Sequence, residues 1–365
     1  MHTNYRITIE GHLDLNWSDW FDNMTISYDE QGNTVLTGPV IDQPALHGIL
    51  DRIQNLNLTL ISVTQFIAEN EEHLLLTSEE KDMHTQQQDS QRTKRNLIIF
   101  VSLIVAIGWL AAGLEALMDD PSAEGMGMGL WIISPLAISI LLRIFAGDGW
   151  RDLGIHPRLG TNAQWYGVSA LIYVISTALV LGIGVIIGAT DLIGDGVGGF
   201  ISVFVAAFVS LFIKNIFEEF GWRGYLAPKV HTLGWNTFAA HGFVGLVWAA
   251  WHMPYYLVLL DTTDFESYTS QSMIAFIPLV FLGLMVASIA YGEIHLLTGS
   301  VWPAVLMHAV GNAFTTALIQ EDYIEMESNL EFLVTPGPEG VLSIIFITLV
   351  GIQLYRLRKK QTLTA

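Results

Sequence analysis

Long apolar runs dominate the pattern of hydrophobic and polar positions from residue 96 onward. The runs occupy residues 96–117, 129–147, 164–188, 198–219, 238–260, 272–291, 301–320 and 339–356. A helix needs about 20 residues to cross the hydrocarbon core of a bilayer, which is roughly 30 Å thick. The pattern therefore predicts an all-α polytopic membrane protein with eight transmembrane helices.

Apolar and polar side chains instead alternate over short stretches in residues 4–66. The stretches YRITIEG, MTISYDE, TVLTGPV and LTLISVTQF are typical of strands, and Gly32 with Asn33 predicts a turn between the second and the third. Asp42, with Pro44 just behind it, marks the start of a helical run, ALHGILDRIQNL. Residues 1–67 are therefore expected to form a small α+β domain that precedes the membrane helices.

The segments between and after these parts are polar. Residues 68–95 are rich in Glu, Gln and Ser, which favours either a linker or a helix that projects from the membrane. Residues 358–365 form a basic tail. The chain is thus divided into an N-terminal domain (1–67), a polar linker (68–95), a membrane domain (96–357) and the tail.

The charges of the loops predict the orientation. Outside the N-terminal region, Lys and Arg lie only in segments 143–158 and 214–229 and in the stretch RLRKKQ at the C-terminal end, whereas the alternate loops carry acids and no Lys or Arg. The positive-inside rule then predicts a multi-pass protein of the cell membrane with both termini in the cytoplasm. The N-terminal domain would lie there too, where it either binds a cytoplasmic partner, gates access to the membrane domain, or serves only as a stability or assembly module.

Composition supports the membrane assignment and excludes several functions. Hydrophobic residues make up 52% of the chain and charged residues 14%, with a mean hydropathy of +0.46. The chain has 0 cysteines, which excludes disulfides, a thiol nucleophile and cysteine-ligated zinc. The formal net charge of -19 argues against nucleic acid as a partner, because phosphate contacts need clustered Lys and Arg.

Polar residues able to do chemistry are few in the predicted spans and gather at three places. These are Glu218, Glu219 and Arg223, then His252, and then His308 and Asn312. Such residues are costly in a bilayer and rarely lack a partner or a task. Each also has a structural alternative, since a Glu–Arg pair can staple a helix end and a lone histidine can be a hydrogen-bonded packing residue. Their presence on three helices of one half of the protein favours a site.

The spacing of neighbouring charges predicts different roles for the two adjacent glutamates. Glu219 lies four residues before Arg223, the favourable order for a helical ion pair, and is expected to be neutralised. Glu218 lies about 100° away around the helix. Lys214 precedes it by four residues in the less favourable order, so Glu218 is expected to keep a free face that can take a proton from water.

The two later groups supply imidazole and amide. His308 and Asn312 are four residues apart, so one helix face presents both, and both can donate to a developing oxyanion. HExxH and a GxSxG elbow do not occur, and no Asp lies in a predicted span to form an aspartyl dyad. From chemistry alone, Glu218, His252 and His308 could supply three zinc ligands, although this leaves no separate base unless Glu219 leaves its arginine.

The three groups resemble the motifs of the CPBP family, the CAAX-protease and bacteriocin-processing membrane proteins also called the Abi family. EEFGWR fits its EExxxR pattern and HAVGN fits HxxxN, while WAAWH takes the place of FxxxH with Trp248 where phenylalanine is usual. The neighbouring RGYL, WHMP and LTGSVWPAVLMHAVGN also look like the family. The resemblance covers roughly residues 96–357, is specific in the last four predicted spans, and leaves out the N-terminal domain.

The resemblance implies an intramembrane endopeptidase that acts on a membrane-associated peptide or protein in CAAX-type or related processing. Glu218 would activate a water with help from His252. His308 and Asn312 would stabilise the oxyanion, and Glu219, Arg223 and Trp248 would support the site. We favour this glutamate-base mechanism and leave a divalent metal such as zinc open.

Two other functions compete with the intramembrane endopeptidase. A catalytically silent scaffold or bacteriocin self-immunity protein of the same fold should have lost a motif residue, and none is missing. A proton-coupled transporter should show two similar halves, whereas the polar residues here are confined to one.

The expected depths of the site residues do not coincide. At about 1.5 Å per residue, His308 lies roughly 10 Å into its predicted span, His252 nearer 20 Å into its own, and Glu218 close to the end of the fourth. Convergence requires tilted helices or a fourth span that continues through GWRGYLAPKV.

Overall fold

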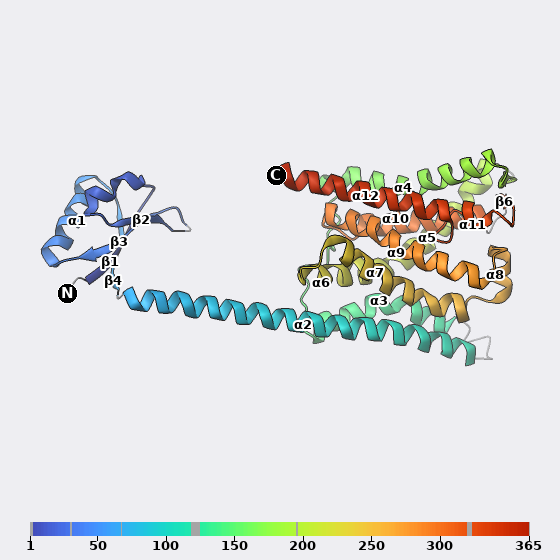
Figure 1. Ribbon diagram of the computed structural model, residues 1–365, viewed down its shortest axis with the longest axis horizontal. Helices are drawn as coiled ribbons and strands as arrows, with labels where there is room; N and C mark the ends of the chain where they lie inside the picture. The colour runs from blue at the N-terminus through green and yellow to red at the C-terminus, as the bar shows by residue number, and fades with distance from the viewer. Residues whose placement is uncertain are drawn as a thin grey trace. The chain divides into compact units, whose positions relative to one another are not determined.

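The computed structural model describes residues 3–29, 31–66, 68–117, 125–194, 196–319 and 323–364 (Figure 1). The chain divides into two compact units, Met1–Asp89 and Ser90–Ala365. Each unit has a hydrophobic core of its own.

The N-terminal unit is a four-stranded antiparallel sheet with one helix packed on it. Its strands are β1 (Thr3–Ile9), β2 (Thr25–Tyr28), β3 (Thr34–Val40) and β4 (Leu60–Phe66), in the order β2-β3-β1-β4. Ile7 of β1 lies opposite Leu36 of β3. Both pack with Leu46, Ile49 and Ile53 of helix α1 (Gln43–Asn55), so one face of the sheet is removed from water.

The turn and cap expected from the sequence are observed in this unit. Asp42 caps α1 by accepting a hydrogen bond from the backbone N–H of Ala45 at 2.9 Å. Gly32 has a φ of 82°, and Asp29 accepts a hydrogen bond from the backbone N–H of Asn33 at 2.8 Å, which closes the turn between β2 and β3. A short 3₁₀ helix, η1 (Leu15–Phe21), lies between β1 and β2, where the sequence pattern predicted no helix or strand.

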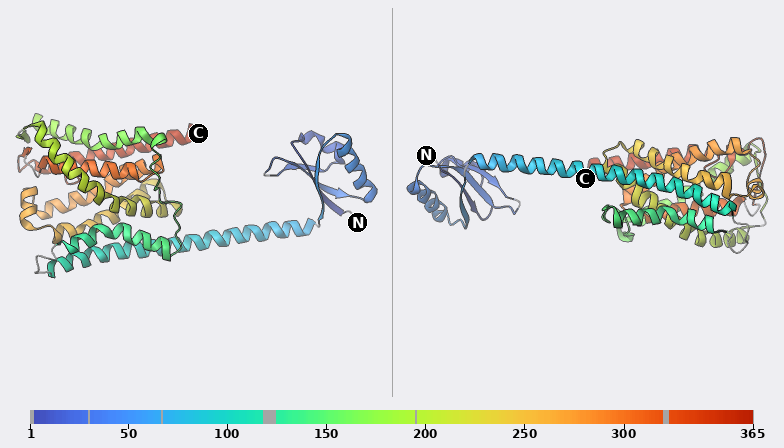
Figure 2. Two further views of the ribbon diagram at one scale, coloured as in Figure 1. Left: turned by 180° about the vertical axis from the view of Figure 1, so that it is seen from behind. Right: turned by 90° about the horizontal axis from the view of Figure 1, so that it is seen from below.

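The second unit is a bundle of long helices that lie side by side (Figures 1 and 2). They are α2 (Ala68–Leu117) from Ser90 onward, α3 (Met126–Phe145), α4 (Leu159–Ile186), α5 (Val197–Gly221), α7 (Thr237–Pro254), α9 (Met273–Thr298), α10 (Trp302–Ile319) and α12 (Val341–Thr364). Shorter elements join them: the π-helical turns η2 (Trp222–Leu226) and η3 (Tyr255–Leu259), the helices α6 (Ala227–Thr232), α8 (Thr262–Tyr268) and α11 (Glu331–Val334), and the paired strands β5 (Thr190–Leu192) and β6 (Ile324–Met326).

Within the described residues, 7 helices are long and apolar enough to cross a membrane, which makes this a multi-pass membrane protein. The predicted count of eight spans is not confirmed, because α10, which corresponds to the predicted span 301–320, is not among the seven. Its polar His308 and Asn312 lower its hydropathy, and most of its residues are buried in contact with α4, α5 and α9. The orientation of the termini stays a prediction.

Two helices extend beyond their predicted bounds. The fourth predicted span does not end at residue 219, because one apolar helix runs from Val197 to Thr232 through η2 and α6. Helix α2 begins at Ala68, so residues 68–95, expected to be either a linker or a projecting helix, are helical. The acidic loops predicted after the first and seventh spans include residues 118–124 and 320–322, which lie outside the described residues.

Ionic contacts tie the loop between α3 and α4 to its neighbours. Asp152 accepts a hydrogen bond from Arg143 of α3 at 2.6 Å and lies 3.0 Å from Nζ of Lys229 of α6. Burial alone would raise the pKa of Asp152, but the hydrogen bonds and charges of Arg143 and Lys229 outweigh it and lower this pKa below its ordinary value. The end of the helix that carries the glutamates is thereby anchored.

Candidate active site

Glu219 is held in a buried network that joins three helices. Its Oε1 accepts hydrogen bonds from Arg223 at 3.0 Å and from Nδ1–H of His308 at 2.9 Å. The Arg223 guanidinium lies 4.7 Å from the ring centroid of Trp248 and 4.6 Å from that of Tyr291. Glu219 and Arg223 are both fully buried, and a buried charge is tolerated only with such partners. The predicted pair therefore also fixes α10 through His308.

The turn after the glutamates is widened and closely packed. Residues Trp222–Leu226 form the π-helical turn η2, and all of them are buried, Arg223 included. Gly221, just before this turn, touches α3, because a Cβ at its position would lie 2.4 Å from Cβ of Pro135. The absent side chain at Gly221 thus lets α5 approach α3 at the level of the glutamates.

Glu218 is enclosed by partners of its own. Its Oε1 lies 2.9 Å from Nζ of Lys214, and its Oε2 accepts a hydrogen bond from the indole N–H of Trp248 at 3.2 Å. Its side chain is 0% exposed. The expectation that Glu218 keeps a free face is therefore not met. Away from water, the attraction between Lys214 and Glu218 is stronger than on an exposed helix, and it outweighs the less favourable order of the pair.

His252 has one basic ring nitrogen and is surrounded by aromatic side chains. Its Nδ1 lies 2.9 Å from the carbonyl oxygen of Trp248, one turn earlier on α7. A carbonyl oxygen only accepts, so Nδ1 carries the hydrogen and, in the neutral imidazole, Nε2 keeps its lone pair. The rings of Trp131, Trp251 and Tyr256 surround the imidazole at centroid distances of 5.6, 4.8 and 6.1 Å.

His308 and Asn312 lie on α10 and face the same cavity as His252. The Nδ1–H of His308 is donated to Glu219, which leaves Nε2 outside that contact. The indole ring of Trp248 lies 5.4 Å from the ring of His308 and 5.8 Å from that of His252, so one side chain contacts both histidines. The structure thus brings the predicted site residues together in spite of their unequal expected depths, and the extension of α5 is part of the reason.

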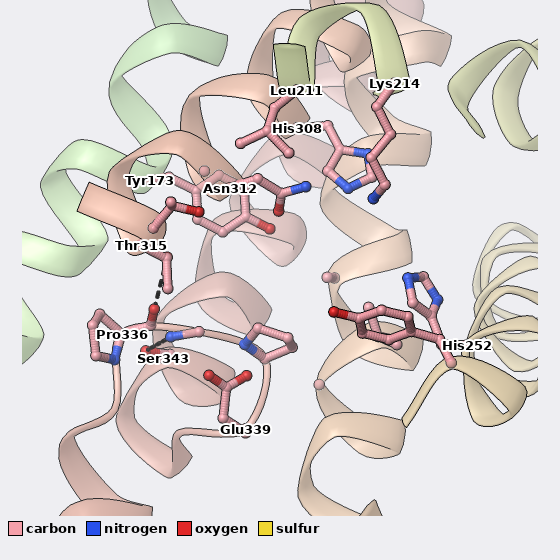
Figure 3. A pocket seen from close by; sticks show the side chains of 18 of the residues that line it. Tyr173, Leu211, Lys214, His252, His308, Asn312, Thr315, Pro336, Glu339 and Ser343 are labelled. Carbon is pink, nitrogen blue, oxygen red and sulfur yellow. Dashed lines mark hydrogen bonds between the residues drawn. The ribbon is translucent and has the colours of Figure 1, made fainter. Parts of the chain in front are cut away.

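The cavity beside these residues has a volume of about 710 Å³, within the usual range of ligand pockets. Its wall includes Lys214, Trp248, His252, His308 and Asn312. Glu218 does not reach the wall, because Lys214 and Trp248 cover its carboxylate. Figure 3 shows Lys214, His308 and Asn312 at one end of the cavity and Glu339 at the other.

Several residues of the wall were not found by sequence reasoning. They are Tyr173 of α4, Tyr268 of α8, Tyr291 of α9 and Glu339 just before α12. The tyrosines belong to different helices, and no spacing connects them. Glu339 had one signal, since an acidic residue stands at the first position of a predicted apolar span.

The site residues do not form a metal centre. Among the described residues, no group of three or more His, Asp or Glu side chains is placed to hold a metal ion. The carboxylate oxygens of Glu218 contact Lys214 and Trp248. A zinc set of Glu218, His252 and His308 would first have to break both contacts, so no step is assigned to a metal.

Two family models match the chain. Residues 199–314, which contain Glu218, His252, His308 and Asn312, match the model described as Type II CAAX prenyl endopeptidase Rce1-like. Residues 4–64 match a domain of unknown function, DUF8691, which fits an extra small N-terminal domain. No curated protein matches the chain.

The match over residues 199–314 confirms the family resemblance drawn from the three motifs, and the matched residues lie within the unit of apolar membrane helices. More narrowly, residues 199–314 are a domain of the Rce1-like type II CAAX prenyl endopeptidase family.

Proposed function

We propose that the protein is an intramembrane endopeptidase that hydrolyses a peptide bond of a membrane-associated peptide or protein, in CAAX-type or related processing. One observation carries the proposal: Trp248 donates a hydrogen bond to Glu218 and contacts the rings of His252 and His308 at the wall of the cavity. A carboxylate base, two imidazoles and an amide are thereby collected beside a space that can hold a peptide segment.

Glu218 acts as the general base in this proposal. Its carboxylate becomes available when Lys214 releases Oε1, and Lys214 is 25% exposed, so its ammonium can turn toward water. A water held between Glu218 and Nε2 of His252 loses a proton to the carboxylate while its oxygen attacks the scissile carbonyl carbon. The proton passes from Glu218 to the leaving nitrogen as the C–N bond breaks.

His308 and Asn312 stabilise the oxyanion that forms on the scissile carbonyl oxygen. The side-chain amide of Asn312 donates to it directly. His308 donates from Nε2 only as an imidazolium, and the Glu219 carboxylate at its Nδ1 stabilises that positive charge. Glu219 and Arg223 are positioning residues, since neither lines the cavity.

A catalytically silent scaffold or bacteriocin self-immunity protein of the same fold is the competing function. One observation favours it, namely that both carboxylate oxygens of Glu218 are engaged and its side chain stays away from the cavity wall. If Lys214 never releases Glu218, water has no base.

The test is cleavage of a quenched-peptide library by the purified full chain in liposomes. We expect the wild type to cleave, and Glu218→Gln and His252→Ala each to lose at least about 10²-fold in kcat/KM, the usual effect of removing a general base. Glu325→Gln, exposed on β6, is the matched control and should keep the wild-type rate.

Thermal unfolding separates lost chemistry from lost structure. Glu218→Gln should unfold close to the wild type, because Lys214 is partly exposed and can return to water. Glu219→Gln should cost about 3–5 kcal/mol, because Arg223 is left buried without its counter-charge. If the wild type cleaves nothing across lipids, pH values and metal ions, the silent scaffold is the better function.

A further inference from the structure

The end of the cavity away from Lys214 and His308 holds a buried carboxylate that the proposed mechanism does not use. Figure 3 shows Glu339 pointing into the cavity across from Lys214 and His308. Only 1% of Glu339 is exposed. Tyr256 and Tyr268 line the same cavity, and the hydroxyl of Tyr268 donates a hydrogen bond to the Glu339 carboxylate.

The segment that carries Glu339 is fixed by the helices beside it. The hydroxyl of Thr315 on α10 donates to the carbonyl oxygen of Pro336 at 2.8 Å. On α9, Gly283 makes room for the carbonyl group of Pro338, whose oxygen would be 1.9 Å from a Cβ at that position. The position of the Glu339 carboxylate is therefore set by the packing of two membrane helices.

The charge at this end of the cavity is not balanced by the protein. Within the ranges that the structure describes, Glu339 forms no ion pair with a Lys, Arg or His side chain, whereas the buried Glu218, Glu219 and Glu293 each do. Glu331 is also buried without an ion pair, but Thr269 and Ser270 donate several hydrogen bonds to its carboxylate. Burial without a counter-charge disfavours the ionised carboxylate, and a cation bound beside Glu339 would stabilise that ionised form.

The surroundings of Glu339 suit an organic cation. Tyr256 and Tyr268 line the same cavity, and aromatic rings attract an ammonium or a guanidinium. At the opposite end the wall carries the ammonium of Lys214, whose carboxylate partner Glu218 does not line the cavity, so this end offers no carboxylate acceptor to such a group. The two ends of the cavity thus differ in charge, and a cationic group is directed to the Glu339 end.

We propose that the Glu339 end of the cavity is a substrate subsite that binds a basic side chain, lysine or arginine. The inference rests on the proposed peptidase function and adds a substrate class to it. Glu339 would be a specificity-determining residue, since it touches the substrate without taking part in bond cleavage.

The geometry also limits where the basic residue sits in the peptide. Thr315, which contacts the segment of Glu339, lies seven positions after His308 on α10, a distance of roughly 10 Å along a helix. An extended peptide covers that distance in about three residues. The lysine or arginine is therefore expected about three positions from the scissile bond.

The first arm of the test measures cleavage by the full chain in detergent. Lipids with amine headgroups are left out, because a lipid amine is itself a cation that could occupy the proposed subsite. Peptides carry lysine at each position in turn, and each is paired with a peptide that has norleucine there. We expect the wild type to prefer one lysine position by at least about tenfold in kcat/KM, and Glu339→Gln to reduce that preference below about twofold. Glu339→Asp, which keeps the charge, should restore part of it.

Glu331→Gln is the matched control for this arm. Glu331 is also buried, at 3% exposure, and lies eight residues earlier, but it accepts a hydrogen bond from the backbone N–H of Ser270 at 3.0 Å and does not line the cavity. The lysine preference should survive in this variant. Equal cleavage of the lysine and norleucine peptides by the wild type, or an undiminished preference in Glu339→Gln, would overturn the inference and leave the peptidase function standing.

The second arm measures binding without cleavage. Fluorescence anisotropy of labelled peptides on Glu218→Gln protein should show tighter binding of the lysine peptide, and the difference should vanish when Glu339→Gln is added. Agmatine, a free guanidinium, should compete only where Glu339 is present. If the wild type cleaves no peptide, the proposed function fails, but this binding arm still tests the inference. Equal Kd values for the lysine and norleucine peptides would refute it, as would competition by agmatine in the double variant.

Discussion

At the scale of residues, the two adjacent glutamates differ in their surroundings and not in their type. Glu219 is held by Arg223 and His308, and Glu218 by Lys214 and Trp248. Arg223 has no exposed surface, whereas Lys214 is 25% exposed. Only the Lys214 pair can therefore open without leaving a cation buried, which separates a reactive carboxylate from a positioning one.

Asp152→Asn should lower the melting temperature at neutral pH, because its contacts with Arg143 and Lys229 are lost. These contacts lower the pKa of Asp152 below its ordinary value of 3.8, so their stabilisation is fully present above that pH and is lost as the pH falls through the lower folded value. The difference from the wild type should thus stay constant from about pH 7 to about pH 5 and shrink below about pH 4.

Thermal unfolding across this pH range measures the effect, and Asp191→Asn, exposed on β5, serves as the control. A variant that unfolds with the wild type at pH 7 would remove the stabilising role of this loop.

At the scale of elements, the site depends on how α5 continues. Segments α5, η2 and α6 form one apolar helix from Val197 to Thr232, and the π turn within it follows directly on the glutamates. Single π-helical turns inside α-helices are frequent at functional sites. Here the turn keeps Arg223 buried beside Trp248 and Tyr291, on which the histidine contacts depend.

Gly221→Ala should destabilise the protein by about 1–3 kcal/mol, the usual cost of overpacking. The added methyl group would meet Cβ of Pro135 at 2.4 Å, so α5 would have to move away from α3 and take both glutamates with it. Peptide cleavage should fall together with the melting temperature.

Gly167→Ala on the exposed side of α4 is the matched control, since a Cβ there meets nothing within 4 Å. It should be neutral or stabilise by up to about 1 kcal/mol, because alanine has the higher helix propensity. A Gly221→Ala protein as stable and active as this control would contradict the close packing of α3 and α5.

At the scale of the whole molecule, every residue of the site comes from the unit Ser90–Ala365, which has its own core. A variant that begins at Gln86 removes the first part of α2 (Ala68–Leu117) and keeps its apolar part entire. It should stay folded and cleave short peptides at the wild-type rate. If the N-terminal domain recruits or gates protein substrates, cleavage of those substrates in cell membranes should fall.

Quantitative comparison of membrane-protein fragments from cells that carry either form measures this effect. Unchanged substrate choice and abundance would remove the recruitment role and leave a stability or assembly module. Loss of cleavage of short peptides would instead show that the membrane unit needs the N-terminal domain.

The sequence by itself determined the features that depend on local pattern and composition. Alternation predicted the four strands, and the helical run that starts behind Asp42 and Pro44 predicted α1. Apolar length predicted the membrane helices, and spacing of four residues predicted the Glu219–Arg223 pair. Each of these follows from the period of a helix or strand, or from the length needed to cross a bilayer, which a few neighbouring residues encode.

Only the tertiary structure decided which side chains meet. His308 contacts Glu219 across 89 positions of the chain, and Trp248 contacts Glu218 across 30. The burial of α10, the cover of Lys214 over Glu218 and the place of Glu339 in the cavity likewise depend on helices packed from distant parts of the sequence. Helical periodicity fixes the face of a residue on its own helix, but not the neighbour that this face will meet, because packing between helices sets that choice.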